Sequence, residues 1–273
     1  MTTTMTTTNN PAHIVVTGVN KIFQTTDREV IALKDINLTI PQGQFVCLLG
    51  PSGCGKSTLL NAAAGFSMPT SGSITADGKL VTGPGPDRGM VFQEYALFPW
   101  MTVEQNIRFG LEIKGLSVSE MAPIVTNLLQ KLGLSEFRTR FPKDLSGGMR
   151  QRVAIARVLA LDSPILLMDE PFGALDALTR RNLQDELLRI WAELGKTVIF
   201  VTHSIEEAIY LADRIVVMTY RPGTVKRDML VDLPRLRDPA SAEFNALKRE
   251  LGQLVMEEQQ RHHNSEILAA AVD

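Results

Sequence analysis

The sequence predicts an α/β protein with a buried parallel sheet, and the segments that follow its strands carry the evidence. Apolar runs at residues 45–49, 165–168 and 197–201 have the length of buried strands, and helical periodicity separates them. The first run leads into a glycine-rich segment, the second into two adjacent carboxylates, and the third into a threonine and a histidine. Because open α/β sheets bind ligands outside the carboxyl ends of their strands, we expect these segments to meet at one sheet edge.

The size and composition of the chain are those of a folded globular protein. It has 273 residues, of which 44% are hydrophobic and 21% charged. This length suits one large domain or a core with a subdomain. The formal net charge of −2 provides no bulk field for nucleic acid, so we expect no nucleic-acid partner.

The first residues differ from the rest in composition. Residues 1–11 are polar and rich in threonine, and we expect a disordered leader there. The leader has neither the basic end nor the apolar centre of a signal peptide. No apolar run in the sequence approaches the roughly 20 residues needed to cross a bilayer. Any role at a membrane would therefore depend on a partner.

Residues 50–58 read GPSGCGKST and match the phosphate-binding pattern G-x-x-x-x-G-K-[ST]. The glycines allow backbone conformations in which successive N–H groups point at one anion. Lys56 supplies a mobile charge for the β- and γ-phosphates, and the Ser57 hydroxyl can bind Mg²⁺. An ordinary glycine-rich turn is the alternative, but the apolar strand before and the helix after favour a P-loop NTPase core. The predicted phosphate-binding residues are Gly50, Pro51, Ser52, Gly53, Cys54, Gly55, Lys56, Ser57 and Thr58.

Two segments beside this core have strand patterns of their own. Residues 14–40 contain β-branched runs joined by a polar loop at 24–29, and a second short strand region spans 71–81. They predict an antiparallel β subdomain. Phe23 stands among polar neighbours at the end of the first run, where it either stacks on a nucleotide base or belongs to the core.

Residues 95–158 change to helical periodicity and predict an α-helical subdomain inserted into the core. A capping box from Ser117 to Glu120 begins one of its helices. A glycine-bearing helix entrance follows at Ser146, Gly147 and Gly148. Its free N–H groups could hold an anion, although a serine that only caps the helix explains the same pattern.

Polar residues follow the remaining strands. Asp169 and Glu170 come directly after an apolar run, where two carboxylates are costly to desolvate unless they serve a metal or a water. Asp169 suits Mg²⁺ and Glu170 suits the attacking water, whereas a polar strand end is the alternative. His203 and Gln93 also follow strands, and each could instead be a structural or an ordinary loop residue.

The two cysteines, Cys47 and Cys54, lack partners at metal-ligand spacing and are interpreted as reduced thiols. Cys54 lies near Lys56 and near the start of a helix, both of which favour a thiolate. We therefore expect a maleimide to label Cys54 and inactivate the protein, and nucleotide to slow the labelling.

The C-terminal part of the sequence predicts a last strand followed by a helical tail. Residues 214–218 are expected to complete the sheet, so that the predicted nucleotide-binding domain spans 12–225. The tail, 226–273, carries one amphipathic helix, and His262 and His263 are expected to be solvated. The apolar residues of that helix are Phe244, Leu247, Leu251 and Leu254.

In combination, these motifs resemble those of ATP-binding cassette (ABC) ATPase subunits over roughly residues 13–225. GPSGCGKST resembles the family's P-loop, LSGGMRQR at 145–152 its signature motif, and ILLMDEP at 165–171 its metal-binding strand. Residues 174–176 resemble its subunit-contact turn. Phe23 falls where the family places an adenine-stacking aromatic, which reverses the preference for a core residue that its sequence neighbours alone would give.

The resemblance implies ATP and Mg²⁺ as cofactors. It places Glu170, His203 and Gln93 in catalysis, as catalytic glutamate, switch histidine and glutamine loop. It places Ser57, Gln93 and Asp169 at the metal.

The resemblance also implies partners. Each ATP would lie between two copies of the chain in a head-to-tail homodimer, held by the P-loop of one and by Ser146, Gly147 and Gly148 of the other. Integral membrane permease subunits would bind the dimer at the cytoplasmic face of the inner membrane, and a periplasmic or lipoprotein solute-binding protein would act indirectly.

Two short segments, Pro-Asp-Arg-Gly at 86–89 and Leu-Phe-Pro-Trp at 97–100, resemble importers of the nitrate, sulfonate and taurine group. The ATPase of an exporter or lipoprotein-release complex is one alternative. A soluble, non-transport ABC ATPase is another, although such chains carry coiled-coil insertions or two cassettes, which this sequence lacks.

Residues 95–101 group aromatic and other apolar side chains without any charge. Pro99 interrupts regular structure there, so burying the whole run is difficult, although Leu97 and Phe98 could belong to the core. Exposed apolar patches usually mark an interface. We therefore expect this run to line a groove for a permease helix, with Trp100 as its anchor.

Overall fold

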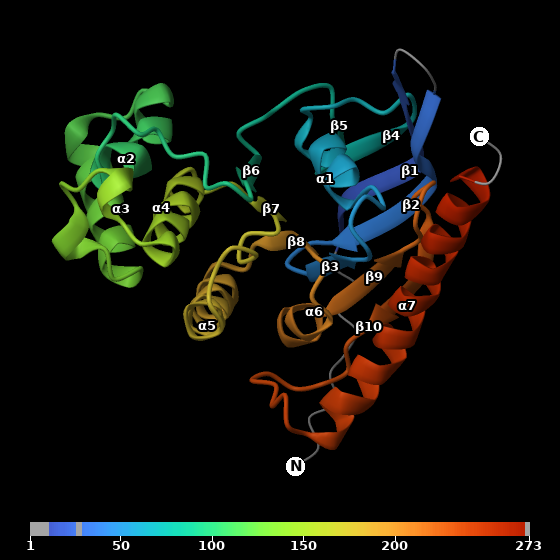
Figure 1. Ribbon diagram of the computed structural model, residues 1–273. Coiled ribbons are helices and arrows are strands. Elements are labelled where there is room, and N and C mark those ends of the chain that lie inside the picture. Colours follow the sequence, from blue (N-terminus) through green and yellow to red (C-terminus); the bar gives the residue numbers. More distant parts are fainter. Residues whose placement is uncertain (1–10, 26–28, 271–273) are drawn as a thin grey trace.

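The computed structural model describes residues 11–25 and 29–270, and it shows an α/β core, an antiparallel sheet and a helical subdomain (Figure 1). The predicted leader, apart from Pro11, lies outside the described residues. The predicted fold class is confirmed. In the part of the chain that the structure describes, no helix is both long and apolar enough to span a membrane.

Within the described residues, the larger sheet has six strands in the order β10-β9-β3-β8-β7-β6. The pairs from β9 to β6 are parallel, so β3, β7, β8 and β9 all end at the same edge. Their apolar sequences follow from burial on both faces, which is typical of parallel sheets. The strands are β3 (Phe45–Leu49), β6 (Arg88–Val91), β7 (Ile165–Asp169), β8 (Thr197–Thr202), β9 (Arg214–Met218) and β10 (Val225–Leu230).

One expectation about this sheet is wrong. Residues 214–218 do not complete it, because β10 pairs antiparallel with β9 beyond them. Three of the six residues of β10 are charged, and its burial is only partial, so its sequence lacks the apolar run that marks a central strand. The core sheet therefore extends beyond residue 225, into the segment that was expected to be a tail.

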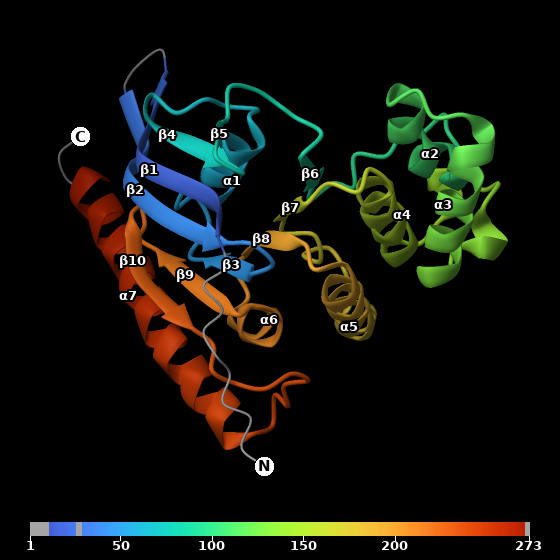
Figure 2. The same ribbon diagram turned by 180° about the vertical axis from the view of Figure 1, so that it is seen from behind.

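The smaller sheet is antiparallel and has the order β2-β1-β4-β5. It packs over helix α1 and one face of the larger sheet, as both views show (Figures 1 and 2). Side chains of β3 alternate between two cores: Val46 and Leu48 face this sheet, whereas Phe45, Cys47 and Leu49 face the helices behind. The elements are β1 (Ala12–Gln24), β2 (Glu29–Pro41), α1 (Lys56–Ala64), β4 (Ser71–Ala76) and β5 (Lys79–Leu80).

The helical subdomain projects to one side of the sheets (Figure 1). The predicted capping box is present: the Ser117 backbone N–H donates to Glu120 Oε2 at 2.7 Å. The apolar stripes of its helices join the core behind the larger sheet. Its elements are α2 (Val103–Ile113), α3 (Val118–Lys131), the 3₁₀ turns η1 (Ser135–Phe137) and η2 (Pro142–Asp144), and α4 (Gly147–Ala160).

Three helices cover the remaining face of the core: α5 (Ala177–Leu194), α6 (Ile205–Leu211) and α7 (Ala242–Ala270). The long helix α7 runs beside β10 and β9 on the side opposite the helical subdomain (Figure 2). Its amphipathic pattern is as expected, with Phe244 and Leu251 buried and Leu247 and Leu254 packed against the core. Farther along α7, Glu258 accepts a hydrogen bond from the backbone N–H of Tyr220, which follows β9 at the edge where the parallel strands end.

Candidate nucleotide site

The predicted P-loop connects β3 to α1 at the carboxyl edge of the larger sheet. Gly55 is the N-cap of α1 with φ at 97°, a left-handed conformation that side chains disfavour. A Cβ at this position would lie 2.7 Å from Leu33 Cδ2 and 2.9 Å from the Ala32 carbonyl oxygen. Gly53 also has a positive φ, of 78°. The close approach of the loop to β2 therefore requires glycine.

Lys56 begins helix α1, and its side chain folds back over the loop. Nζ donates to the carbonyl oxygens of Gly50 at 2.8 Å and Pro51 at 2.9 Å. The residue is 4% exposed, so its ammonium group is held inside the loop together with the N-terminal end of α1. Both features favour a bound anion.

Ser57 and Asp169 meet beside the P-loop. The Ser57 hydroxyl donates to Asp169 Oδ1 at 2.8 Å. Burial raises the pKa of Asp169, and the charge of Glu170 adds to this effect. A cation placed here would offset both costs.

This pair suits Mg²⁺. Among the described residues, no group of three or more His, Cys, Asp or Glu side chains could hold a metal ion. The protein ligands here would be the Ser57 hydroxyl and the Asp169 carboxylate, and both bind through oxygen. Mg²⁺ commonly binds in this way, completing its shell with phosphate oxygens and waters. The residues present fit the ion.

Glu170 and His203 form a second pair at the same edge. His203 Nδ1 lies 2.9 Å from Glu170 Oε2. The Glu170 backbone has φ at 43°, unusual for a residue with a side chain, and its N–H donates to the Val201 carbonyl at 3.0 Å. Strained backbone of this kind is concentrated at functional sites.

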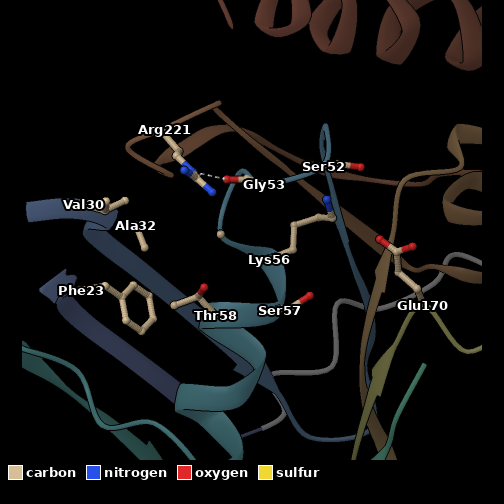
Figure 3. A pocket seen from close by; sticks show the side chains of 11 residues that line it. Phe23, Val30, Ala32, Ser52, Gly53, Lys56, Ser57, Thr58, Glu170 and Arg221 are labelled. Carbon is tan, nitrogen blue, oxygen red and sulfur yellow. Dashed lines mark hydrogen bonds between the residues drawn. The ribbon is translucent and has the colours of Figure 1, made fainter. Parts of the chain in front are cut away.

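Lys56, Ser57 and Glu170 line one pocket, whereas their neighbours Asp169 and His203 are not part of its wall (Figure 3). Phe23 lies at one end and Glu170 at the other, with Lys56 and Ser57 between them. Phe23 is 42% exposed, so its ring has an open face and is not a core residue. The pocket is lined by Phe23, Val30, Ala32, Ser52, Gly53, Gly55, Lys56, Ser57, Thr58, Glu170 and Arg221. It can take a base at the Phe23 end and phosphates at the P-loop.

Other predicted residues lie outside this pocket. Gln93 follows β6 and is exposed, and among the described residues it is not part of the pocket wall. Ser146 is exposed too, as the N-cap of α4, where its Oγ accepts from the Met149 N–H at 3.3 Å. At Gly148 a Cβ would lie 2.6 Å from Thr179 Cγ2, so glycine lets α4 approach α5 closely. The roles expected of Gln93, Ser146, Gly147 and Gly148 stay predictions.

The expectation for Cys54 is wrong. Its side chain is 0% exposed, and burial raises the pKa of the thiol. Lys56 Nζ lies 3.7 Å from Cys54 Sγ and lowers the pKa, but by less than burial raises it. The Cys54 N–H donates to the Pro51 carbonyl at 3.4 Å. Cys54 therefore supports the loop from beneath and is not a reactive thiolate.

The sequence reasoning missed Arg221. This residue follows β9, and β9 ends at the same edge as β3 because the two strands are parallel. The rule that selected Asp169 and His203, a polar residue just after a parallel strand, could have found it. Its side chain lines the pocket above Gly53 (Figure 3).

Comparison with known proteins agrees with this site. The model of the ABC transporter family matches residues 33–173. The chain is 48% identical to a nitrate import ATP-binding protein, NrtD, of Synechocystis sp., over 87% of this chain and 90% of that protein. It is 49% identical to a taurine import ATP-binding protein, TauB, of Jannaschia sp., over 81% of each.

A solved structure is similar as well. The ATP-binding cassette MJ0796, in a dimeric post-hydrolysis state bound to ADP and Pi, superposes with a TM-score of 0.72 at 34% identity, covering 81% of this chain and all of that one. The family match spans more than half of the chain and includes the P-loop and both carboxylates. The chain therefore belongs to the ABC transporter family, as one of its ATP-binding proteins.

Proposed function

We propose that this chain is the ATP-hydrolysing subunit of an ABC importer for a small anionic solute such as nitrate, a sulfonate or taurine. The observation that carries the proposal is a pocket lined by P-loop residues and Glu170, in which Glu170 pairs with His203 and Ser57 pairs with Asp169. The import relatives named above support the solute class.

The residues divide the work of hydrolysis. Lys56 and the N-terminus of α1 would bind the phosphates, Phe23 would stack on adenine, and Ser57 and Asp169 would hold Mg²⁺. A Mg²⁺ bound there would supply positive charge that offsets the negative charge of the phosphate oxygens. Glu170 orients a water and accepts its proton as the oxygen attacks the γ-phosphorus, and the bond to the β–γ bridging oxygen breaks to release ADP. His203 holds the Glu170 carboxylate in place through Nδ1.

The proposal includes a homodimer, because some of the predicted phosphate-binding residues lie outside the pocket of their own chain. Ser146, Gly147 and Gly148 do not line the pocket of their own chain, yet they begin a helix whose N–H groups suit phosphate. In a head-to-tail homodimer they would close the pocket of the other copy. The dimeric ADP-bound relative supports this arrangement.

The remaining partners would be integral membrane permease subunits, with the dimer bound peripherally at the cytoplasmic face of the membrane. A solute-binding protein would deliver solute on the opposite side. Dimer closure on ATP and reopening after hydrolysis would then move the permease. Residues 95–101 are the proposed permease contact.

The test is transport. The chain should co-purify with a permease and, in vesicles with a solute-binding protein, drive ATP-dependent uptake of nitrate, taurine or a sulfonate. ATP-dependent efflux would point to an exporter instead. ATPase activity that no permease stimulates would favour a soluble ABC ATPase.

A further inference from the structure

Arg221 lies against the P-loop, although it belongs to none of the motifs discussed above. Its Nε donates to the Gly53 carbonyl at 3.0 Å. Its Nη2 lies 3.5 Å from the point where a Cβ on Gly53 would stand. In Figure 3 its guanidinium is on the Phe23 side of Lys56, away from Glu170. A nucleotide with its base on Phe23 and its γ-phosphate near Glu170 would bring its α-phosphate closest to Arg221.

The Arg221 guanidinium has N–H donors that do not bond to other described residues. Among the described residues that line the pocket, Lys56 and Arg221 are the cations and Glu170 is the anion. Arg221 is exposed, and only Nε of its guanidinium bonds to another described residue. An arginine carries five N–H donors in a planar fork that suits phosphate oxygens, so Nη1 and Nη2 remain for a ligand.

The loop that carries Arg221 is held by the C-terminal helix. The Tyr220 N–H donates to Glu258 Oε2 at 3.1 Å, and the Tyr220 ring stacks on His262 with centroids 3.7 Å apart. Lys226 Nζ donates to Glu258 Oε1 at 2.7 Å, and Glu258 is 1% exposed. His262 was expected to be solvated, but it packs here against the loop.

The loop is also tied to the wall of the pocket. The Gly223 N–H donates to the Ala32 carbonyl at 3.0 Å, and the Lys34 N–H donates to the Gly223 carbonyl at 2.9 Å. These bonds place Arg221 before any nucleotide arrives. A group positioned in advance loses less conformational freedom when the ligand binds.

We propose that Arg221 is a second phosphate-binding cation of this site, which contacts the α-phosphate while Lys56 serves the β- and γ-phosphates, and that α7 holds it in position. The proposal rests on the proposed function, because it needs a nucleotide in this pocket. It adds a binding residue that acts on ATP and ADP alike and takes no part in cleavage.

Calorimetric titration with ADP, ATP and adenosine tests it. Loss of one partly exposed charge-assisted hydrogen bond should weaken both ADP and ATP about five- to tenfold in Arg221→Ala. Adenosine, measured by competition, should bind Arg221→Ala as it binds the wild type. Arg227→Ala is the matched control, because Arg227 is exposed on β10 a few residues away. It should bind all three ligands normally.

Two further variants separate the effect of the Arg221 charge from the effect of its hydrogen bond to the Gly53 carbonyl. Arg221→Gln keeps a donor for the Gly53 carbonyl but no charge, and we expect it to lose as much affinity as Arg221→Ala. Arg221→Lys keeps the charge and should recover part of the affinity. Full recovery in Arg221→Gln, or an equal loss of adenosine affinity, would overturn the proposal.

Lys56→Ala distinguishes a failure of the role proposed for Arg221 from a failure of the proposed function. If Lys56→Ala loses ADP and ATP while Arg221→Ala binds them normally, only the role of Arg221 fails. If Lys56→Ala itself binds both nucleotides like the wild type, the pocket is not the nucleotide site and the proposed function fails with it.

Discussion

The carboxylate of Glu170 and the imidazole of His203 face each other across the ends of two neighbouring strands, with Oε2 and Nδ1 2.9 Å apart. Asp169 is in register with Val201, so the residues that follow β7 and β8 necessarily come together. The positive φ of Glu170 then turns its side chain into the pocket. A carboxylate fixed by a neighbouring strand is well placed to orient one water.

Glu170→Gln should stop turnover without preventing nucleotide binding. The amide is similar in size but cannot accept the proton of the water, and loss of a general base costs about a hundredfold or more in rate. Because binding persists, an ATP-bound dimer should accumulate and be seen by size-exclusion chromatography with ATP. Glu243→Gln, an exposed change on α7, is the control and should hydrolyse normally. Wild-type hydrolysis in Glu170→Gln would remove this residue from catalysis.

Phe23→Ala should weaken ATP binding. Stacking of a base on an aromatic ring contributes about 1–3 kcal/mol, which corresponds to roughly a five- to hundredfold change in Kd. Phe23→Tyr keeps the ring and should bind ATP like the wild type. Fluorescence titration with an ATP analogue measures both. Equal affinity in the alanine variant would show that the base does not lie on Phe23.

Native protein should react slowly with maleimide at both cysteines. Cys47 and Cys54 are 0% exposed, and burial raises the pKa of each thiol, so little thiolate is accessible. In denaturant, both thiols should be fully labelled before the native protein shows measurable labelling. Mass spectrometry of the labelled peptides measures the rates. Fast labelling of native Cys54 that MgATP slows would restore the earlier expectation of a reactive thiolate.

The parts of the site that the sequence could predict are those governed by local rules. The P-loop, Asp169 and His203 each follow an apolar strand, and parallel strands bring their ends to one edge. Their placement therefore follows from the order of elements alone. Phe23 also lines the pocket, in line with the family resemblance.

The parts of the site that the sequence did not predict correctly depend on contacts between segments that are far apart in the sequence. Arg221 reaches the P-loop because Glu258, 38 positions after Tyr220, holds its loop, and no local pattern encodes that contact. Cys54 was misjudged because the charge of neighbouring Lys56 is visible in the sequence, whereas the burial that outweighs it is not. Ser146 lies outside the pocket of its own chain, so its role needs a second copy.

Glu207→Gln should change how stability depends on pH. Glu207 is 6% exposed and accepts hydrogen bonds from Thr202 Oγ1 and from Gln184 Nε2. Burial raises its pKa, and these hydrogen bonds oppose the effect only in part. The folded protein therefore keeps a proton that the unfolded chain releases, so the free energy of unfolding falls as pH rises from the ordinary value of 4.5 to the raised pKa.

The glutamine variant carries no titrating group there and should escape this loss. Denaturant unfolding at about pH 5 and about pH 8 should show the wild type losing more stability than Glu207→Gln. Glu206→Gln, its exposed neighbour, is the control and should follow the wild type. If Glu207→Gln and the wild type change in parallel, Glu207 is ionised in the folded protein at both pH values.

The segment 95–101 is divided between core and surface. Leu97 packs against the main core, and the Phe98 ring packs against the Phe109 ring at an interplanar angle of 55°, with centroids 4.6 Å apart. Arg157 on α4 fixes the backbone by donating to the Ala96 carbonyl at 2.6 Å. Trp100, by contrast, is 69% exposed, and its ring centroid lies 5.7 Å from that of Phe98. A large exposed aromatic on a rigid support is typical of an interface anchor.

Trp100→Ala should therefore leave the isolated subunit intact and weaken its assembly with the permease. Surface substitutions change folding stability by about 0.5 kcal/mol or less, whereas the loss of an interface anchor costs about 2 kcal/mol or more of binding. Thermal unfolding and ATP affinity should match the wild type. Co-purification with the permease, or transport per ATP hydrolysed in vesicles, should fall. Ile113→Ala, 74% exposed on α2 outside this segment, is the control and should transport normally. Normal transport by Trp100→Ala would exclude Trp100 from the coupling contact, and unfolding of the variant would show that its ring supports the subdomain instead.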